Sequence, residues 1–142
     1  MKKHLHTNVA QYALVLRDKK LLILWPSNNT PLWVLPGGRL DEDDQDPKNA
    51  LEREVEEELG MDVTINEPVC VDMWDMEGKE HRYAVFFFCE LEEPDTNINL
   101  SEDHKSFEWL TYDQLKENLM TDEKRGRPGF ILIDKLRDRG LL

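Results

Sequence analysis

Long apolar runs, cysteines and basic segments are all scarce in this sequence of 142 residues. No segment approaches the roughly 20 apolar residues that a membrane-spanning helix needs, and the charged start Met1–His6 has no apolar run behind it to act as a signal peptide. Cys70 and Cys89 lack a Cys-x-x-Cys spacing and lie in apolar, strand-like segments, so we interpret them as packed thiols rather than a disulfide or catalytic pair. We therefore expect one cytosolic domain over residues 1–142 that does not contact membranes.

Acidic residues dominate the charge of the chain, with 30 Asp and Glu against 18 Lys and Arg and a net charge of −12. Such a field repels phosphates and cannot supply the basic surface that a nucleic-acid polymer requires, so we expect no such partner. The charge is concentrated, because residues 41–62 hold eleven acidic and two basic residues, a net of −9. A cluster of carboxylates is typical of a site for hard divalent cations, although a solvated acidic surface is the alternative on composition alone.

Apolar segments rich in β-branched and aromatic residues predict strands at 8–16, 20–25, 32–35, 63–65, 69–74, 81–90 and 107–110. Pro36-Gly37-Gly38 predicts a turn after the third of these strands. Asp46-Pro47 and Gly60 predict the start and the end of a helix at about 47–59, and two further helices are expected over 112–119 and 128–139. This order, in which one helix interrupts the strands and two further helices follow them, indicates an α+β or layered α/β/α domain.

The helix predicted at 47–59 carries two stripes of side chains. Leu51, Val55 and Leu59 recur at a spacing of four and define its buried stripe. Glu54, Glu57 and Glu58 fall on a neighbouring stripe, since positions i, i+3 and i+4 share a face. Like charges at these spacings oppose helix formation by a few tenths of a kcal/mol per pair. A divalent cation would offset that repulsion, and the glycines just upstream would let a metal or phosphate approach the backbone, so the pattern favours a metal-phosphate site.

The segment Gly38 to Met61 resembles the Nudix box, Gly-x5-Glu-x7-Arg-Glu-U-x-Glu-Glu-x-Gly-U, in which U is an aliphatic residue. Residues 53–61, Arg-Glu-Val-Glu-Glu-Glu-Leu-Gly-Met, fit its second half throughout, and the lead-in at 33–39, Trp-Val-Leu-Pro-Gly-Gly-Arg, is also similar. The resemblance implies a Nudix-type α/β/α sandwich with a mixed β-sheet, whose catalytic helix is the one at about 47–59.

One departure from the Nudix pattern lies in the first half of the box. Gln45 stands where the pattern has Glu, and the loop from Gly38 is one residue longer than x5. In the family that Glu supports the Arg, so the departure bears on loop geometry more than on the reaction class. Asp44 could take its place if the loop bulges.

The resemblance also implies roles for individual residues. Glu54 and Glu58 would bind Mg²⁺ or Mn²⁺, Glu57 would share in the binding, and the Gly37 carbonyl could be a further ligand. Arg53 would orient Glu54. The general base could be Glu54 or a carboxylate of a later loop, Glu102 or Asp103, because such a loop carboxylate often precedes the strand that we predict at 107–110.

For the substrate, the resemblance implies hydrolysis of a diphosphate linkage in a nucleotide. Arg39 beside the glycines could contact a phosphate next to Gly38, and Trp33 could stack on a base, although an aromatic residue on a strand is more often part of the core. No signature of a Nudix subfamily stands outside the box, so a nucleoside triphosphate or nucleoside diphosphate derivative is the default. Family members often form homodimers, but no sequence feature marks an interface.

Two other functions remain open. A nucleotide sensor that binds without cleaving is suggested by Gln45 and the lengthened loop. An isomerase acting on a prenyl diphosphate would need a longer chain and a catalytic cysteine, for which Cys70 and Cys89 are poor candidates.

Overall fold

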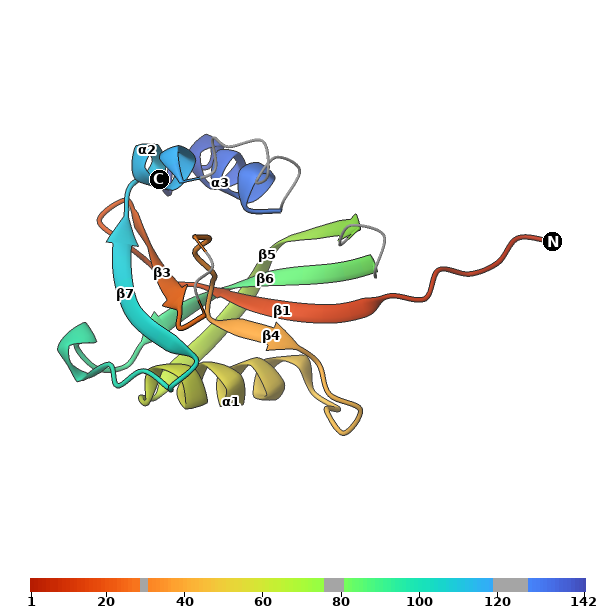
Figure 1. Ribbon diagram of the computed structural model, residues 1–142, viewed down its shortest axis with the longest axis horizontal. Helices are drawn as coiled ribbons and strands as arrows, with labels where there is room; N and C mark the ends of the chain where they lie inside the picture. Colours follow the sequence, from red (N-terminus) through yellow and green to blue (C-terminus); the bar gives the residue numbers. More distant parts are fainter. Residues whose placement is uncertain (29–30, 76–80, 119–127) are drawn as a thin grey trace.

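The computed structural model describes residues 1–28, 31–75, 81–118 and 128–142. Its strands form two sheets that lie between helices on opposite sides (Figure 1). The first sheet has the order β4 (Gly37–Arg39), β1 (Asn8–Leu14), β6 (His81–Leu91) and β5 (Val63–Asp75). In it β1 runs parallel to β6, and the other neighbours are antiparallel. The second sheet is antiparallel, with the order β2 (Leu16–Arg17), β3 (Lys20–Pro26) and β7 (His104–Leu110).

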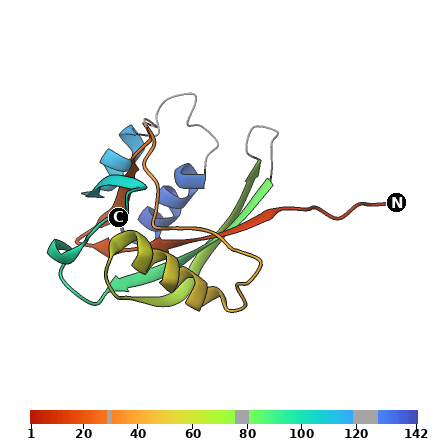
Figure 2. The same cartoon turned by 60° about the horizontal axis from the view of Figure 1, so that its bottom comes forward.

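Helix α1 (Pro47–Leu59) covers one side of the sheets, and α2 (Tyr112–Glu117) and α3 (Pro128–Asp138) cover the other (Figures 1 and 2). Each side has its own apolar cluster. On the α1 side, Leu51, Val55 and Leu59 pack with residues such as Leu22 and Phe87. The opposite cluster joins Leu115, Ile133 and Leu136 to Leu14, Ile23 and Phe86. Burial on both sides therefore fixes α1 against the sheets with its glutamate stripe beside the core.

The predicted α+β class and α/β/α layering are confirmed, and the bounds of α1 agree with the helix predicted at 47–59. The predicted strand at 8–16 is divided between the two sheets at Val15, and the strands predicted at 63–65 and 69–74 form one strand, β5. Helix α2 ends at Glu117, and Leu119, the last residue of the helix predicted there, lies outside the described residues.

The region of the glycines differs from the prediction. A strand at 32–35 is wrong, because only Val34 forms a bridge, to Leu24. Instead of forming a turn, Gly37 and Gly38 belong to β4, which pairs with β1. Gly37 has a φ of +130°, and a Cβ there would collide with the carbonyl oxygen of Gln11. The glycines are therefore needed because two backbones approach closely, a requirement that sequence alone does not distinguish from a turn.

Both cysteines are free thiols; Cys89 is buried and Cys70 is half-buried. Burial raises the pKa of the Cys89 thiol to about 12, which makes it a weak nucleophile near neutral pH. In the described part of the chain, the helices are all too short or too polar to cross a membrane.

Candidate active site

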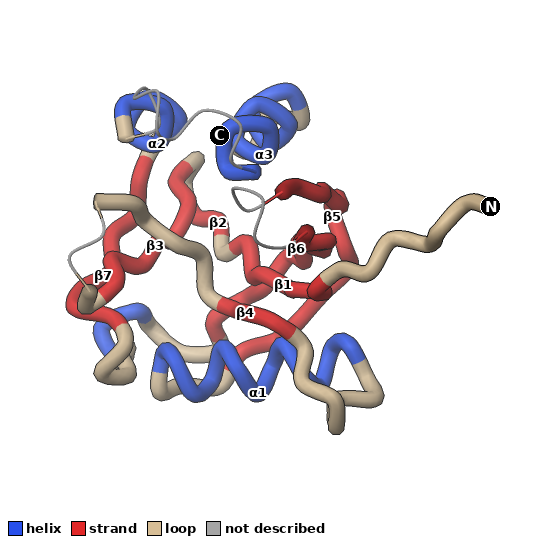
Figure 3. Tube along the Cα trace, turned by 45° about the vertical axis from the view of Figure 1, so that its right-hand side comes forward, coloured by secondary structure: helices blue, strands red, loops and turns tan. Residues whose placement is uncertain are grey.

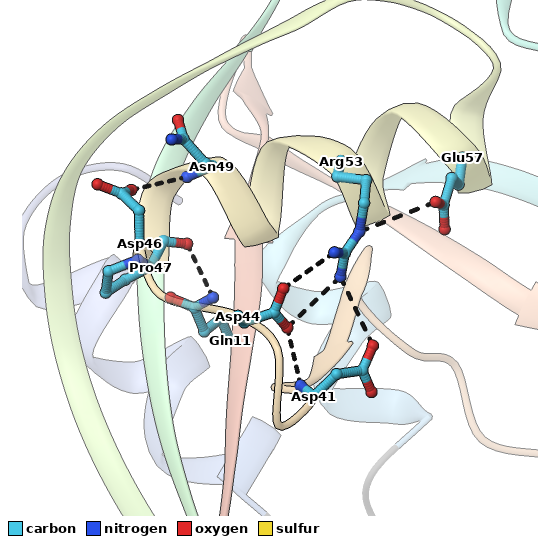
Figure 4. Close-up of polar contacts among 8 residues, drawn as sticks. All are labelled: Gln11, Asp41, Asp44, Asp46, Pro47, Asn49, Arg53 and Glu57. Atoms are coloured by element: carbon cyan, nitrogen blue, oxygen red, sulfur yellow. Dashed lines mark hydrogen bonds and ion pairs between the residues drawn. The ribbon is translucent and has the colours of Figure 1, made fainter.

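Helix α1 begins and ends at residues that commonly cap helices. The Asp46 side chain accepts a hydrogen bond of 3.0 Å from the Asn49 N–H, and Pro47 occupies the first turn, where its missing N–H costs nothing (Figure 4). At the other end, Gly60 adopts a left-handed conformation with a φ of 65°, and its N–H donates to Glu56 O over 2.8 Å. These caps set the register in which Glu54 and Glu58 face β4.

Glu54 and Glu58 lie one helical turn apart beside the two glycines of β4, which runs along α1 (Figure 3). The Gly37 N–H donates to Glu58 Oε2 over 3.2 Å. A Cβ on Gly38 would stand 3.4 Å from Glu54 Oε2, so the absence of a side chain keeps the space beside this carboxylate open. The glycine strand thus lies directly against two glutamates of the predicted stripe.

Both glutamates hold their protons unusually tightly. Burial raises the pKa of Glu58 to about 8; the Gly37 N–H opposes the rise, and the charges of Glu54 and Asp103 add to it. Burial likewise raises the pKa of Glu54 to about 7, against the attraction of Arg53 and with the repulsion of Asp41 and Asp44. Two anionic carboxylates are therefore unfavourable here without a compensating positive charge.

Glu57 is more exposed than this pair. Its carboxylate is 68% exposed and lies 3.9 Å from the Nε of Arg53, one turn earlier (Figure 4). Position i+3 from Glu54 puts Glu57 near the same face, but pairing with Arg53 at i−4 draws its side chain toward solvent. The charge of Glu57 nevertheless adds to the raised pKa of both Glu54 and Glu58. Its share in metal binding stays a prediction.

Arg53 is held by the loop before the helix. Asp44 Oδ1 lies 2.9 Å from its Nη1, and Asp41 Oδ2 lies 3.7 Å from its Nη2 (Figure 4). Gln45, which occupies the position of the pattern's Glu, is exposed. The bulged loop thus brings Asp44 to the arginine, as the sequence suggested it could, and Asp41 is a partner that the sequence did not reveal.

The segment before β7 closes over the C-terminal end of α1. The N–H of Asn99 donates to Leu59 O over 2.8 Å, and the N–H of Ser101 donates to Glu58 O over 3.0 Å. These bonds satisfy carbonyls that a helix end leaves without partners. They also place Asp103 and His104 beside Glu58, since Asp103 raises the pKa of Glu58 and His104 Nε2 lies 3.6 Å from Glu58 Oε2.

The two loop carboxylates differ in their surroundings. The carbonyls of Glu102 and Asp103 accept hydrogen bonds from the side chain and the backbone N–H of Ser27, over 2.7 and 2.8 Å. The charge of Asp103 raises the pKa of Glu58, which indicates that Asp103 lies near this glutamate. Between the two loop residues, the surroundings thus favour Asp103 over Glu102 as the carboxylate that serves the site.

Tyr12 and Arg82 were not identified from the sequence. Tyr12, which pairs with Gly37 across β1 and β4, accepts a hydrogen bond of 3.3 Å from Arg82 Nη1. Burial raises the pKa of Tyr12, and the charges of Glu54 and Glu58 act in the same direction, while Arg82 opposes the rise. A cationic side chain and a phenol therefore border the glutamate pair, and no local spacing could have indicated this, because the two residues lie on separate strands.

The residues predicted to bind substrate lie in different surroundings. Arg39 is exposed at the end of β4, opposite Ala10. Trp33 is buried, with 9% of its surface exposed, and belongs to the cluster on the α2 and α3 side. Its position matches the core alternative for a strand aromatic better than a stacking role.

The donors of this site fit a hard divalent cation that shares its coordination with substrate. Within the described residues, no group of three or more His, Cys, Asp and Glu side chains is gathered closely enough to enclose a metal ion. Mg²⁺ needs no such enclosure, because it commonly binds one or two carboxylates and completes its shell with water and substrate phosphates. Glu54 and Glu58, crowded, half-buried and open toward Gly38, supply that donor set.

Comparison with known proteins places this geometry in context. Residues 6–130 match the NUDIX domain family. The asymmetrical bis(5'-nucleosyl)-tetraphosphatase of Sus scrofa is 28% identical over 98 residues, which cover 67% of this chain and 66% of that protein. Among solved structures, the MutT protein of Methanosarcina mazei Go1 has a TM-score of 0.72 at 21% identity, covering 96% of this chain and 99% of its own. An Ap4A hydrolase of C. elegans has a TM-score of 0.69 at 22% identity, with coverages of 94% and 97%.

Proposed function

This chain belongs to the Nudix family, and on that premise we propose that it is a pyrophosphohydrolase that uses a divalent cation to cleave a nucleotide derivative. The observation that carries the proposal is the pair Glu54 and Glu58, two half-buried carboxylates that face a strand of glycines and whose pKa values are raised to about 7 and 8. A helix built for stability alone would not bury two like charges at this spacing. We take residues 1–142 as one catalytic domain.

Glu54 and Glu58 would hold the cation, and Arg53, fixed by Asp44, would orient Glu54 from outside. When bound, the cation would neutralise charge on the diphosphate oxygens and on the leaving group. Glu57 could add a ligand only after leaving Arg53, and the Gly37 carbonyl stays a proposed ligand.

The reaction requires a water molecule, a proton acceptor and a way to accommodate charge. The water oxygen forms a bond to one phosphorus, the bridging P–O bond breaks, and its electron pair stays on the released phosphate. One proton passes from the water to a protein carboxylate, for which Glu54 and Asp103 are the two candidates. Tyr12 and Arg82 border the same carboxylates, and Arg82 would meet negative charge on the substrate.

For the substrate we propose a dinucleoside polyphosphate ahead of a nucleoside triphosphate. The sequence alone favours the latter by default, but the similarity over 98 residues to asymmetrical bis(5'-nucleosyl)-tetraphosphatases supports the former. Arg39, exposed beside Gly38, would contact a phosphate outside the cleaved linkage.

The structure weakens the support for the sensor and for the isomerase. The sensor hypothesis rests on Gln45 and the longer loop, yet Asp44 contacts Arg53 in place of the missing Glu. The isomerase hypothesis needs a reactive cysteine, whereas Cys89 is buried and burial raises the pKa of both thiols. Hydrolysis is the function we retain.

The test is a product-release screen of dinucleoside polyphosphates, nucleoside triphosphates, nucleotide sugars and ADP-ribose, with Mg²⁺, with Mn²⁺ and with EDTA. We expect cleavage of one class that EDTA abolishes, loss of that activity in Glu58→Gln, and normal activity in the matched helix variant Glu52→Gln. Tight nucleotide binding without product under any metal would replace the hydrolase by the sensor. Cleavage that persists in EDTA would contradict the role of the cation.

A further inference from the structure

His104 occupies an enclosed position at the start of β7, directly behind the end of α1. The turn that carries it is closed by a hydrogen bond of 3.1 Å from the His104 N–H to Ser101 O, and Ser101 is itself bonded to Glu58 O. The imidazole is 11% exposed, and its Nε2 points at Glu58 Oε2 from 3.6 Å. The backbone of the turn and the side chain of His104 thus converge on the same glutamate.

The polar interior of this turn is not explained by packing. Within the described residues, His104 Nδ1 and Ser101 Oγ are buried without a hydrogen-bond partner. Burying polar atoms in this way costs free energy, and an aliphatic side chain would fill the same space without that cost. The presence of an imidazole here calls for a role that an aliphatic side chain could not perform.

The contacts of Glu58 suggest that role. Both the Gly37 N–H, at 3.2 Å, and His104 Nε2, at 3.6 Å, lie against the same oxygen, Oε2. With hydrogen on Nε2, two donors would hold Oε2, limit the rotation of the carboxylate and leave Oε1 for another partner. A separation slightly longer than a hydrogen bond is common for catalytic contacts before the ligands bind.

We propose that His104 is a positioning residue, whose Nε2–H holds Glu58 Oε2 so that Oε1 is presented to the cation. The proposal rests on the proposed function, because it assigns the purpose of the orientation to metal binding at Glu58. In a neutral imidazole one nitrogen donates and the other accepts, so the proposal requires the tautomer with hydrogen on Nε2. Residues that orient a metal ligand in this way typically contribute about 10- to 100-fold in metal affinity or activity.

Three substitutions separate positioning from packing. His104→Leu removes both nitrogens, His104→Gln can place an amide N–H near the position of Nε2, and His104→Asn can place one only near Nδ1. We expect His104→Leu and His104→Asn to lower Mn²⁺ affinity in isothermal titration calorimetry about 10-fold or more, and His104→Gln to restore most of it. The exposed His6→Leu serves as the matched control and should bind Mn²⁺ as the wild type does.

The calorimetry needs no turnover, so its outcome is separate from that of the hydrolase proposal. Where a substrate is cleaved, kcat should fall in parallel with metal affinity at saturating nucleotide, with little change in KM. Equal Mn²⁺ affinity in His104→Leu and the wild type would overturn the positioning role. Equal losses of affinity in His104→Gln and His104→Asn would also overturn it, because they would show that His104 acts through packing alone.

A measurement on the wild type covers the case in which a variant fails to fold. The ¹⁵N chemical shifts of a histidine side chain distinguish its tautomers, and at pH 9 the imidazole is neutral. The expected result for metal-free protein is hydrogen on Nε2 of His104. Hydrogen on Nδ1 instead would remove the donor and overturn the proposal.

Discussion

Both oxygens of the Asp44 carboxylate accept hydrogen bonds from the Arg53 guanidinium, Oδ1 from Nη1 over 2.9 Å and Oδ2 from Nη2 over 3.5 Å (Figure 4). The loop that makes this contact is closed on itself, because the N–H of Asp44 donates to Asp41 O over 3.1 Å and the N–H of Asp41 donates to Asp44 Oδ2 over 2.8 Å. The hydrogen bond from the Asp41 N–H and then the one from Arg53 lower the pKa of Asp44, so this carboxylate remains ionised at neutral pH. Because the loop is one residue longer than in the Nudix pattern, the carboxylate that supports Arg53 comes from Asp44 and not from position 45.

This shift predicts opposite outcomes for two neighbouring residues. Asp44→Asn should lower kcat roughly 10-fold, because Arg53 loses the charge that holds it and Glu54 loses an oriented neighbour. Gln45→Ala should have wild-type kcat, since the Gln45 side chain is exposed. Steady-state kinetics with Mg²⁺ measures both, and melting curves confirm that both variants fold. A larger loss in Gln45→Ala than in Asp44→Asn would show that the position in the pattern matters more than the contact.

The raised pKa values of Glu54 and Glu58 predict how stability depends on pH without metal. The folded protein binds protons at these sites up to about pH 7 and pH 8, whereas unfolded glutamates release them near the ordinary value of 4.5. The stabilising contribution of the two groups is thus fully present below the unfolded pKa and is lost as pH rises through 7 and 8. In EDTA, the free energy of unfolding measured with a denaturant should therefore fall as the pH rises from about 5 to 8.

The control for this prediction is Glu58→Gln, which cannot titrate and should show a shallower fall. Adding Mg²⁺ should stabilise the wild type most at the alkaline end, because the cation binds the deprotonated carboxylates. A free energy of unfolding in EDTA that rises between about pH 5 and pH 8 would contradict the assigned shifts.

The two glycines of β4 predict a second contrast. Gly37→Ala should destabilise the fold by on the order of 1–3 kcal/mol from backbone strain alone, since its φ is +130° and a Cβ would meet the Gln11 carbonyl. Gly38→Ala should fold normally, because its Cβ would stand at an ordinary contact distance of 3.4 Å from Glu54 Oε2. It should nevertheless weaken metal binding by filling the space beside that carboxylate. Chemical denaturation and calorimetry with Mn²⁺ would separate the two effects, and a Gly38→Ala protein with normal metal affinity would argue against a cation at Glu54.

The sequence identified those features of the site that depend on neighbouring residues. The start and end of α1 follow from Asp46, Pro47 and Gly60, whose capping preferences act within one turn. The direction of Glu57 could not be predicted, because it depends on competition between a shared ion and the pairing with Arg53. The position of β4 also depends on a distant segment, because Gly37 and Gly38 pair with β1 instead of forming a local turn.

Contacts over long stretches of sequence determine the rest of the site. His104 and Asp103 reach Glu58 because Asn99 and Ser101 bond to the last carbonyls of α1, and a pattern within either segment gives no sign of this. Tyr12 meets Arg82 through the parallel pairing of β1 and β6. Sequence reasoning could propose the acidic loop as a source of a carboxylate, whereas the bonds of Asn99 and Ser101 to α1 are what bring that loop to the glutamates.

The two loop acids give the last prediction. Ser27 holds the carbonyls of Glu102 and Asp103 at 2.7 and 2.8 Å, so the two peptide groups are fixed, and the charge of Asp103 raises the pKa of Glu58. Asp103→Asn should lower kcat about 100-fold if Asp103 accepts the proton of the attacking water, and the acidic limb of the pH profile of kcat should change with it. Glu102→Gln, the matched control, should retain both kcat and the profile. If Asp103→Asn keeps the acidic limb while Glu54→Gln removes it, Glu54 is the base, and Asp103 contributes only its charge beside Glu58.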